Sequence, residues 1–402
     1  MIIQKEKYNF ITKLIIAILA LGFFYYSYRY VFQYNSESTS PSYRDTPTFL
    51  KFLKYPVMLL IYGYAIVKFK WDKINWIEKT KVTHLLMSIF CCYLLFHTAI
   101  LFDFETLKIF FVSLIPFLFL LHYKSNVNLY AVCRFLSLFY IFSIAYEIIQ
   151  LLLFFLIGRL PALAYENSIS VRFGGPWDDP NGWGIALSFF IPFSYFYYRR
   201  KLFKQIIFLT GIIMLVLTQS LTAIGSFLLS YILYNCLLGG RKRWAYVAFM
   251  LIFLMCGVFL GYALFGSFFT DYISMKQGSI DSHAGSIDTF LSFQWYNYII
   301  GLDKNVFNES DIVNILCYGG IPLLLIWLLI IVIDIICIRD MIWKKPNCPS
   351  FWKASLYYQI SFFVAQFNLP CTRMFYLYVL FNILLCITVY YRMRRIRIVL
   401  VS

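Results

Sequence analysis

Charged residues are scarce in this sequence: Asp, Glu, Lys and Arg together make up 13% of its 402 residues. A soluble globular protein of ordinary composition has about twice that fraction. The shortage of charge therefore excludes a soluble globular surface. Basic residues give a net charge of +16, but they are spread over short segments between apolar runs. Proteins that bind nucleic acid gather basic residues on one solvated face, so we expect no nucleic-acid partner.

Other features are missing as well. The ten cysteines include no CxxC pair, and none lies in the long polar segments described below, so neither a disulfide framework nor a metal site is predicted. We expect no metal and no cofactor. No internal repeat and no low-complexity tract is visible. The first apolar run lacks a small-residue cleavage site, which favours a retained helix over a signal peptide.

Apolar residues are what the sequence has in abundance, with 61% hydrophobic and 21% aromatic residues. A helix crosses the hydrocarbon core of a bilayer in about 20 residues, so the chain has room for about twelve short-looped spans. The predicted runs are 11–32, 55–68, 82–102, 107–122, 131–157, 183–198, 205–219, 221–238, 245–269, 312–338, 353–369 and 374–391.

The distribution of Lys and Arg predicts the sides of the membrane, because cytoplasmic loops are enriched in both. With the N-terminus inside, most basic residues fall in cytoplasmic segments. The stretch 205–238 decides the topology. The basic segments on either side of it, 199–204 and 241–243, both favour the cytoplasm, so two spans joined by a turn near Gln219 and Ser220 are expected. A single span there would invert everything that follows.

The expected fold is therefore an all-α polytopic membrane protein with about twelve transmembrane helices and both termini in the cytoplasm. Residues 1–402 would form a single integral membrane domain. Two long polar segments, 158–182 and 270–311, would lie on the opposite, outer side. They interrupt a layout of otherwise brief loops, which makes them the expected functional loops.

The first outer loop concentrates groups suited to a phosphate. Arg172 supplies a permanently charged guanidinium, Gly174 and Gly175 permit unusual backbone conformations, and Pro180 and Asn181 form a turn before a helix. We expect Asn181 to cap a helix that starts near Trp183, leaving backbone N–H groups that bind anions. The alternative is an ordinary turn with Arg172 as an interfacial anchor.

The second outer loop runs into a helix that begins near Ile312 and carries the cluster Glu309-Ser310-Asp311. Ser310 or Asp311 could simply cap that helix. Alternatively, a carboxylate beside a cationic phosphate site could act as a general base on a sugar hydroxyl. His283 lies in a Gly/Ser-rich stretch, where a lone histidine is either solvated without a role or part of the site. His97 lies in an apolar run and is interpreted as a packing residue.

Two short patterns resemble a known family. The first is Arg172-Phe173-Gly174-Gly175 followed by Pro180-Asn181-Gly182 before an apolar helix. The second runs from Gly301-Leu302-Asp303 through Glu309-Ser310-Asp311 to Tyr318-Gly319-Gly320-Ile321-Pro322. Together with two long outer loops in a multi-span chain, they are similar to the O-antigen polymerase and O-antigen ligase superfamily. Only these patterns are specific, although the resemblance covers most of the chain.

The resemblance implies a GT-C-like, metal-independent glycosyltransferase of the bacterial inner membrane, with its active site facing the periplasm. It would transfer a glycan from undecaprenyl diphosphate to an acceptor sugar, inverting the anomeric carbon. Arg172 would bind the donor diphosphate, and Gly174, Gly175, Pro180 and Asn181 would shape its pocket. Glu309 would be the catalytic base, with Asp311 and His283 among the groups that contact the substrate.

Departures from the family pattern favour a polymerase over a ligase. Ligases usually carry a histidine where this chain has Glu309, and a Ser-Arg pair where it has Ser220-Leu221. The larger outer loop has no arginine, so the second phosphate-binding cation would come from Arg373, Lys304, Lys276 or Arg159, with Arg373 ranked first. The implied partners are lipid-linked donor and acceptor, membrane lipid and a chain-length regulator. The alternatives are a ligase, a lipid-linked glycan flippase or a secondary transporter.

Overall fold

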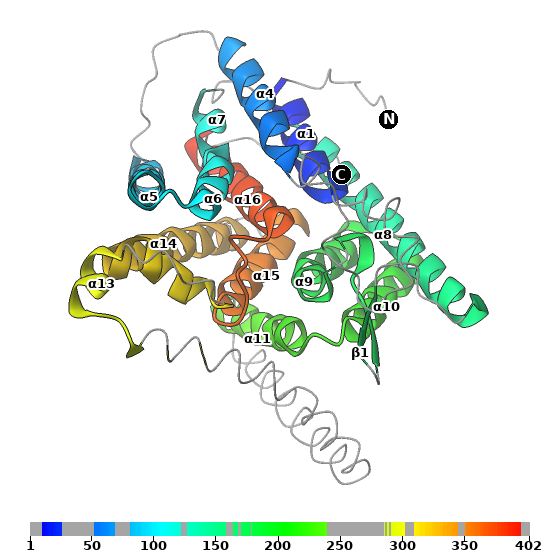
Figure 1. Cartoon of the computed structure of the whole chain (residues 1–402). Helices are drawn as coiled ribbons and strands as arrows, with labels where there is room; N and C mark the ends of the chain where they lie inside the picture. Colours follow the sequence, from blue (N-terminus) through cyan, green and yellow to red (C-terminus); the bar gives the residue numbers. More distant parts are fainter. Residues whose placement is uncertain are drawn as a thin grey trace.

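Helices dominate the structure, a computed structural model whose elements are labelled in Figure 1. It describes residues 10–25, 52–68, 81–121, 127–157, 164–167, 170–177, 179–238, 285, 288, 291–301, 309–344 and 350–394. The helices are α1 (Phe10–Phe24), α4 (Lys54–Val67), α5 (Lys81–Leu101), α6 (Phe104–Ser113), α7 (Ile115–Leu121), α8 (Leu129–Ile157), α9 (Pro180–Tyr197), α10 (Lys201–Leu217), α11 (Leu221–Leu237), α13 (Trp295–Ile300), α14 (Asp311–Lys344), α15 (Ser350–Ala365) and α16 (Phe375–Arg394). They follow the predicted apolar runs closely, except that run 245–269 lies outside the described residues.

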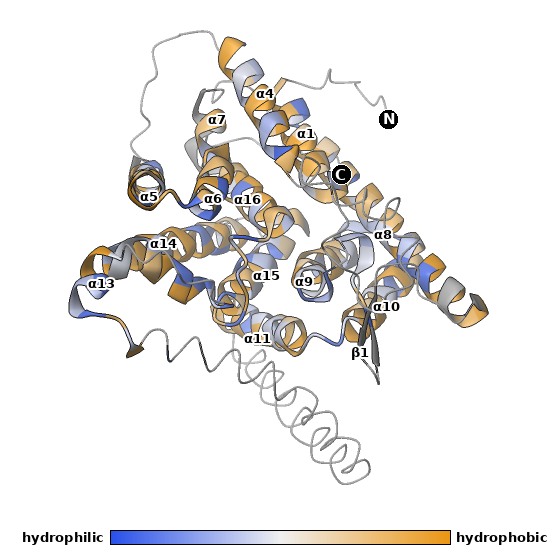
Figure 2. Ribbon diagram, in the orientation of Figure 1, coloured by the Kyte–Doolittle hydropathy of each residue, from blue (hydrophilic) through white to orange (hydrophobic). Residues whose placement is uncertain are grey.

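Several of these helices have the character of membrane segments. Val82–Leu101, Leu129–Leu152 and Asp311–Trp343 are long and apolar enough to cross a bilayer, and Phe10–Phe24, Lys54–Val67, Leu221–Leu237 and Phe375–Val389 are shorter apolar helices. Much of the length of the described helices is coloured hydrophobic in Figure 2. Many large apolar side chains are exposed, among them Phe155 at 78% and Val67 at 80%. The fold thus agrees with a helical membrane protein, while the count of twelve spans and the sides of the loops stay predictions.

The stretch 205–238 contains two helices, as the sequence predicts. α10 ends at Leu217 and α11 begins at Leu221. Ser220 caps α11 by accepting a hydrogen bond from the Ala223 backbone N–H at 3.2 Å, which satisfies one of the N–H groups left open at a helix start.

Two features differ from the predicted layout. The run 107–122 is broken into α6 and α7 at Leu114, since Pro116 has no N–H with which to continue the helical hydrogen bonds. The all-α prediction also missed a short antiparallel pair in the first loop, formed by β1 (Ala164–Asn167) and β2 (Ser170–Phe173). The 3₁₀ helix η3 (Gly175–Trp177) follows β2 and leads to α9.

Helix α9 forms the core of the described bundle. It packs against α15, α10 and α11, and its side chains are buried almost continuously from Pro180 to Ser194. Trp177 and Trp183 are among the largest fully buried side chains, with 0% exposure each. The segment that carries the first motif is thus fixed by packing on several sides.

Helix α14 is kinked close to its start. Gly319 and Gly320 depart from helical geometry, and Gly320 has φ 64° and ψ −164°, a conformation that essentially only glycine adopts. The backbone of α13 lies so close to Gly320 that an added Cβ would overlap the carbonyl of Ile299. α13 packs beside α14 in this region (Figure 1), and the kink sets off Asp311–Tyr318 as a short arm.

Candidate functional site

The N-terminus of α9 is built by the segment Asp179-Pro180-Asn181-Gly182. Asp179 is the N-cap: it is extended, with φ −135° and ψ 101°, and its Oδ1 accepts from the Asn181 N–H at 3.0 Å. Pro180 occupies the first turn, where its missing N–H costs nothing. The prediction that Asn181 caps a helix starting near Trp183 is therefore wrong, because the cap falls on the carboxylate before the proline.

The side chain of Asn181 is instead used to hold Arg172. Its Oδ1 accepts from Arg172 Nη2 at 2.8 Å, and Arg172 Nε donates to the carbonyl oxygen of Thr218 at 3.0 Å. The guanidinium thus bridges the start of α9 and the turn between α10 and α11. The structure brings together the two halves of the first motif, with a fixed cation at a helix N-terminus.

The glycines of the motif make room for packing behind Arg172. Gly174 and Gly175 are buried, and Gly175 adopts a positive φ of 56°. A Cβ at Gly175 would overlap the indole ring of Trp183. Trp183 is held in turn by Glu147 of α8, whose Oε2 accepts from its indole N–H at 3.1 Å. A larger residue at position 175 would displace either the loop or the ring.

The start of α16 contacts the start of α9. The hydroxyl of Tyr376 donates to Asp179 Oδ2 at 2.5 Å, and the ring of Tyr376 stacks on Trp177 with centroids 4.1 Å apart. The indole N–H of Trp177 donates to the Phe23 carbonyl at 3.0 Å. Residues from α1, the first loop and α16 therefore meet at this point.

A second polar centre is formed by the connection between α15 and α16 and the start of α14. Asp311 accepts from Thr372 twice, from the backbone N–H at 2.6 Å and from the hydroxyl at 2.7 Å. The Asp311 backbone N–H donates to the Gln366 carbonyl at 2.9 Å, and Ser310 Oγ donates to the same oxygen at 3.2 Å. The start of α14 is thus tied to this connection by backbone and side-chain bonds.

Arg373 lies in this second centre. Its Nε and Nη2 donate to the hydroxyl of Tyr318, at 2.9 and 2.5 Å. Burial alone would lower the pKa of Arg373, but its interactions with Tyr318 and Asp311 outweigh burial and raise that pKa above its ordinary value. Arg373 is therefore a firmly protonated cation near the end of the second motif.

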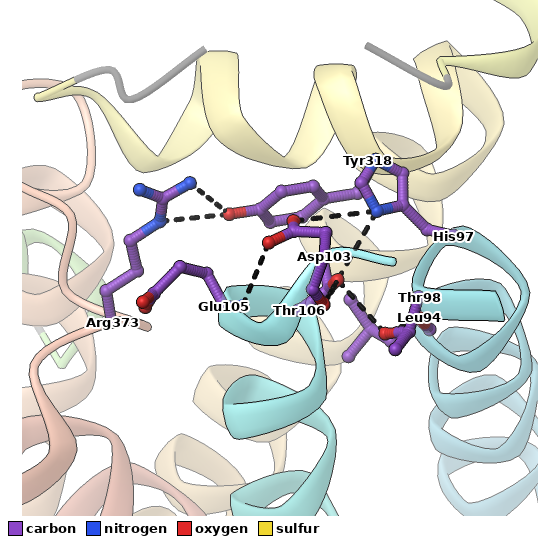
Figure 3. Close-up of polar contacts among 8 residues, drawn as sticks. All are labelled: Leu94, His97, Thr98, Asp103, Glu105, Thr106, Tyr318 and Arg373. Carbon is purple, nitrogen blue, oxygen red and sulfur yellow. Dashed lines mark hydrogen bonds and ion pairs between the residues drawn. The ribbon is translucent and has the colours of Figure 1, made fainter. Parts of the chain in front are cut away.

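The end of α5 and the start of α6 add His97 and the carboxylates of Asp103 and Glu105 to this centre (Figure 3). His97 Nδ1 lies 3.3 Å from Thr106 Oγ1 and 3.7 Å from Asp103 Oδ2. The imidazole ring also meets the ring of Tyr318 edge to face, with centroids 5.1 Å apart. Glu105 is close enough to Arg373 to contribute to its electrostatics. His97 is fully buried, as its interpretation as a packing residue implies, but it also takes part in a polar network that the sequence did not reveal.

The structure groups the predicted residues into two sets. Arg172, Gly174, Gly175, Pro180 and Asn181 form the first, and Arg373 and Asp311 belong to the second. Glu309 lies two residues before Asp311 and is half-buried. The remaining predicted residues lie outside the described part of the chain: Arg159, Lys276, His283 and Lys304.

Sequence reasoning assigned no role to Asp179, Thr218 and Tyr376, and it named Tyr318 only as part of the second motif, without its bond to Arg373. Their contacts span 46 to 197 residues of sequence, so no local pattern reveals them. Asp179 did carry a local signal, because an Asp before Pro at a helix start is a favoured cap. Among the described residues, His, Cys, Asp and Glu form no group of three placed to hold a metal ion.

The chain was also compared with known proteins. No protein-family model matches it, and no curated protein matches it either. The site is therefore characterised by its own residues: the guanidinium of Arg172, held at the start of α9, and Arg373, which is bonded to the Tyr318 phenol and interacts electrostatically with Asp311 and Glu105.

Proposed function

We propose that this protein is a membrane glycosyltransferase that polymerises surface polysaccharide from undecaprenyl-diphosphate-linked repeat units. The observation that carries the proposal is the bond between Arg172 and Asn181, 2.8 Å long. These are the residues on which the first motif's resemblance rests, and they lie together at the N-terminus of a buried helix. A guanidinium and helix N–H groups are favourable partners for a diphosphate.

The second centre supports the proposal by its composition. The second motif contributes Asp311 and Tyr318 to the surroundings of Arg373, and Glu309 precedes the same helix. A cation here would stabilise negative charge, while a carboxylate can accept a proton. Such a pairing suits the transfer of a sugar from a phosphate leaving group to a hydroxyl.

In the proposed reaction, the hydroxyl oxygen of the acceptor sugar attacks the anomeric carbon of the donor glycan. The bond from that carbon to the diphosphate oxygen breaks, and the diphosphate leaves with the electron pair. Glu309 takes the hydroxyl proton, and Arg172 stabilises the charge that builds on the leaving group. The configuration at the anomeric carbon is inverted.

The test is the length of surface polysaccharide in cells that carry Arg172→Ala or Glu309→Gln. We expect both variants to lose long repeat ladders while still displaying single repeat units. Arg339→Ala is the matched control. Arg339 lies at the other end of α14, and the only bond described for its side chain is an ion pair with the neighbouring Asp340, at 2.9 Å. Ladders of normal length in both site variants, with the protein present in the membrane, would contradict the proposal.

The rival functions give different products in the same experiment. Loss of a flippase would remove single units as well as ladders, because no lipid-linked unit would reach the outer face. Loss of a ligase would leave long polymer attached to its lipid carrier. Purified protein incubated with lipid-linked repeat units then tests whether polymerisation needs a chain-length regulator, which is proposed here only from the family resemblance.

A further inference from the structure

We infer that Asp179 and Tyr376 form a positioning contact that holds the Arg172 loop in place for the donor diphosphate. The inference rests on the proposed function and deepens it. Neither residue belongs to the motif positions assigned to the substrate. Their hydrogen bond, 2.5 Å from Tyr376 Oη to Asp179 Oδ2, joins the start of α9 to the start of α16, two segments that are 197 residues apart in sequence.

Asp179 uses its two carboxylate oxygens for different purposes. Oδ1 accepts from the Asn181 backbone N–H at 3.0 Å and so caps α9. Oδ2 accepts from Tyr376. Asn181 in turn accepts from Arg172 at 2.8 Å. An uninterrupted series of hydrogen bonds therefore runs from the hydroxyl of Tyr376 to the guanidinium of Arg172, and a carboxylate held from both sides has little freedom to rotate.

The ring of Tyr376 is itself held firmly. It stacks on Trp177 at a centroid distance of 4.1 Å and an interplanar angle of 23°. Trp177 is fully buried and bonded to the Phe23 carbonyl. On the other side, a Cβ at Gly182 would overlap the Tyr376 hydroxyl, so glycine at this position is what allows the phenol to approach Asp179. The contact is enclosed by packing on both sides.

The position of Tyr376 in the chain links this contact to the second centre. Tyr376 lies in the first turn of α16, three residues after Arg373. Arg373 is bonded to Tyr318 of α14, and the neighbouring Thr372 is bonded to Asp311. The short segment 372–376, which ends in the first turn of α16, therefore contacts both groups of site residues. In our inference, the hydroxyl of Tyr376 fixes the position of one group relative to the other.

The experiment compares Tyr376→Phe with Tyr378→Phe in purified full-length protein. Both substitutions remove one buried hydroxyl from the same helix, but Tyr378 bonds Ser113, at 2.6 Å, and not α9. Two quantities are measured: steady-state kinetics with lipid-linked repeat units, and affinity for undecaprenyl diphosphate in detergent. Tyr376→Phe keeps the ring on Trp177 and removes the bond to Asp179.

We expect Tyr376→Phe to weaken undecaprenyl diphosphate binding and raise the donor KM by roughly tenfold, the scale on which supporting hydrogen bonds affect the groups they orient. Tyr378→Phe should leave both unchanged. Asp179→Asn keeps a capping oxygen but loses the charge, and it should weaken binding similarly. The double variant Asp179→Asn/Tyr376→Phe should bind no more weakly than the weaker-binding single variant, because both substitutions remove the same interaction.

The inference is overturned if Tyr376→Phe binds undecaprenyl diphosphate like the wild type, or if the two single effects simply add in the double variant. Equal losses of undecaprenyl diphosphate affinity in Tyr376→Phe and Tyr378→Phe would also overturn the inference, because they would show that removing any buried hydroxyl from α16 weakens binding. If Tyr376→Phe fails to fold, the test is the undecaprenyl diphosphate affinity of Asp179→Asn compared with that of Tyr378→Phe. Failure of the proposed function can be told apart from failure of this inference, because the wild-type protein itself would then form no polymer.

Discussion

At the scale of single residues, Asp311 is bonded to the connection between α15 and α16 through both of its carboxylate oxygens. Its side chain is fully buried, and both oxygens accept from Thr372. A buried donor left without an acceptor costs about 1–3 kcal/mol, and more where the lost partner is charged. The role of Asp311 in the folded protein is thus to hold the connection that carries Arg373.

We therefore predict that Asp311→Ala lowers the free energy of unfolding by about 3 kcal/mol, because the backbone N–H and the hydroxyl of Thr372 both lose their acceptor. The measurement is detergent-solubilised unfolding followed by Trp fluorescence. Asp340→Ala is the control on the same helix. The side chains of Arg339 and Asp340 are 36% and 44% exposed, and a solvent-exposed pair contributes less than about 1 kcal/mol. Similar losses in the two variants would contradict this role for Asp311.

Whether a contact between two residues could be predicted from the sequence depends on how close the residues are in the chain. The proximity of Arg172 and Asn181 could be predicted, since nine residues separate them and a turn lies between. The identity of the cap could not be read from Asn181 alone, because Asp179 competes for the same role. The bond of Tyr376 to Asp179 depends on how α16 packs against α9, and no pattern within either segment encodes that packing.

At the scale of elements, the helices follow the apolar runs because a helix that crosses a bilayer needs a run of about 20 apolar residues, whatever its contacts with other helices. What the runs do not reveal is where a helix bends. The break at Leu114 depends on one proline, and the kink of α14 depends on the backbone conformation of Gly320. The kink matters for the site, because it separates Tyr318 from the rest of α14.

We predict that Gly320→Ala disturbs the second centre while leaving the rest of α14 intact. The native φ and ψ are costly for alanine, by about 1–3 kcal/mol, and the new Cβ would overlap the Ile299 carbonyl. The arm Asp311–Tyr318 would shift, and Tyr318 would lose its bond to Arg373. The expected result is a protein that is less stable by about 2 kcal/mol or more and loses polymer length in cells.

Gly225→Ala is the matched control for that substitution. Gly225 lies within α11, and nothing stands within 4 Å of the position of an added Cβ. Alanine is favoured over glycine in a helix by about 1 kcal/mol, so stability should stay equal or rise. A Gly320→Ala protein as stable as Gly225→Ala would mean that the kink tolerates a side chain.

At the scale of the whole molecule, the enzyme proposal depends on which side of the membrane each polar segment faces. The residues of the two centres come from both long polar segments, from the ends of α5 and α6 that face each other, from the turn between α10 and α11, and from the connection between α15 and α16 with the first turn of α16. A reaction on lipid-linked glycans requires all of them on one side. The stretch 205–238 contains two helices, and the predicted topology requires both of them to cross the membrane, because the basic segments on either side favour the cytoplasm.

We predict that position 288 faces the outside and position 200 the cytoplasm. Single cysteines placed by Asp288→Cys and Arg200→Cys in a background without native cysteines can be labelled with a membrane-impermeant maleimide, as both native side chains are exposed. The Asp288→Cys protein should react in intact cells, and the Arg200→Cys protein only after permeabilisation. Labelling of both cysteines in intact cells would mean that the chain crosses the membrane an even number of times between positions 200 and 288. The segments 158–182 and 270–311 would then lie on opposite sides of the membrane and could not form one site. The opposite pattern, with position 200 alone accessible, would invert the protein and leave its arginines on the side where lipid-linked glycans are made rather than joined.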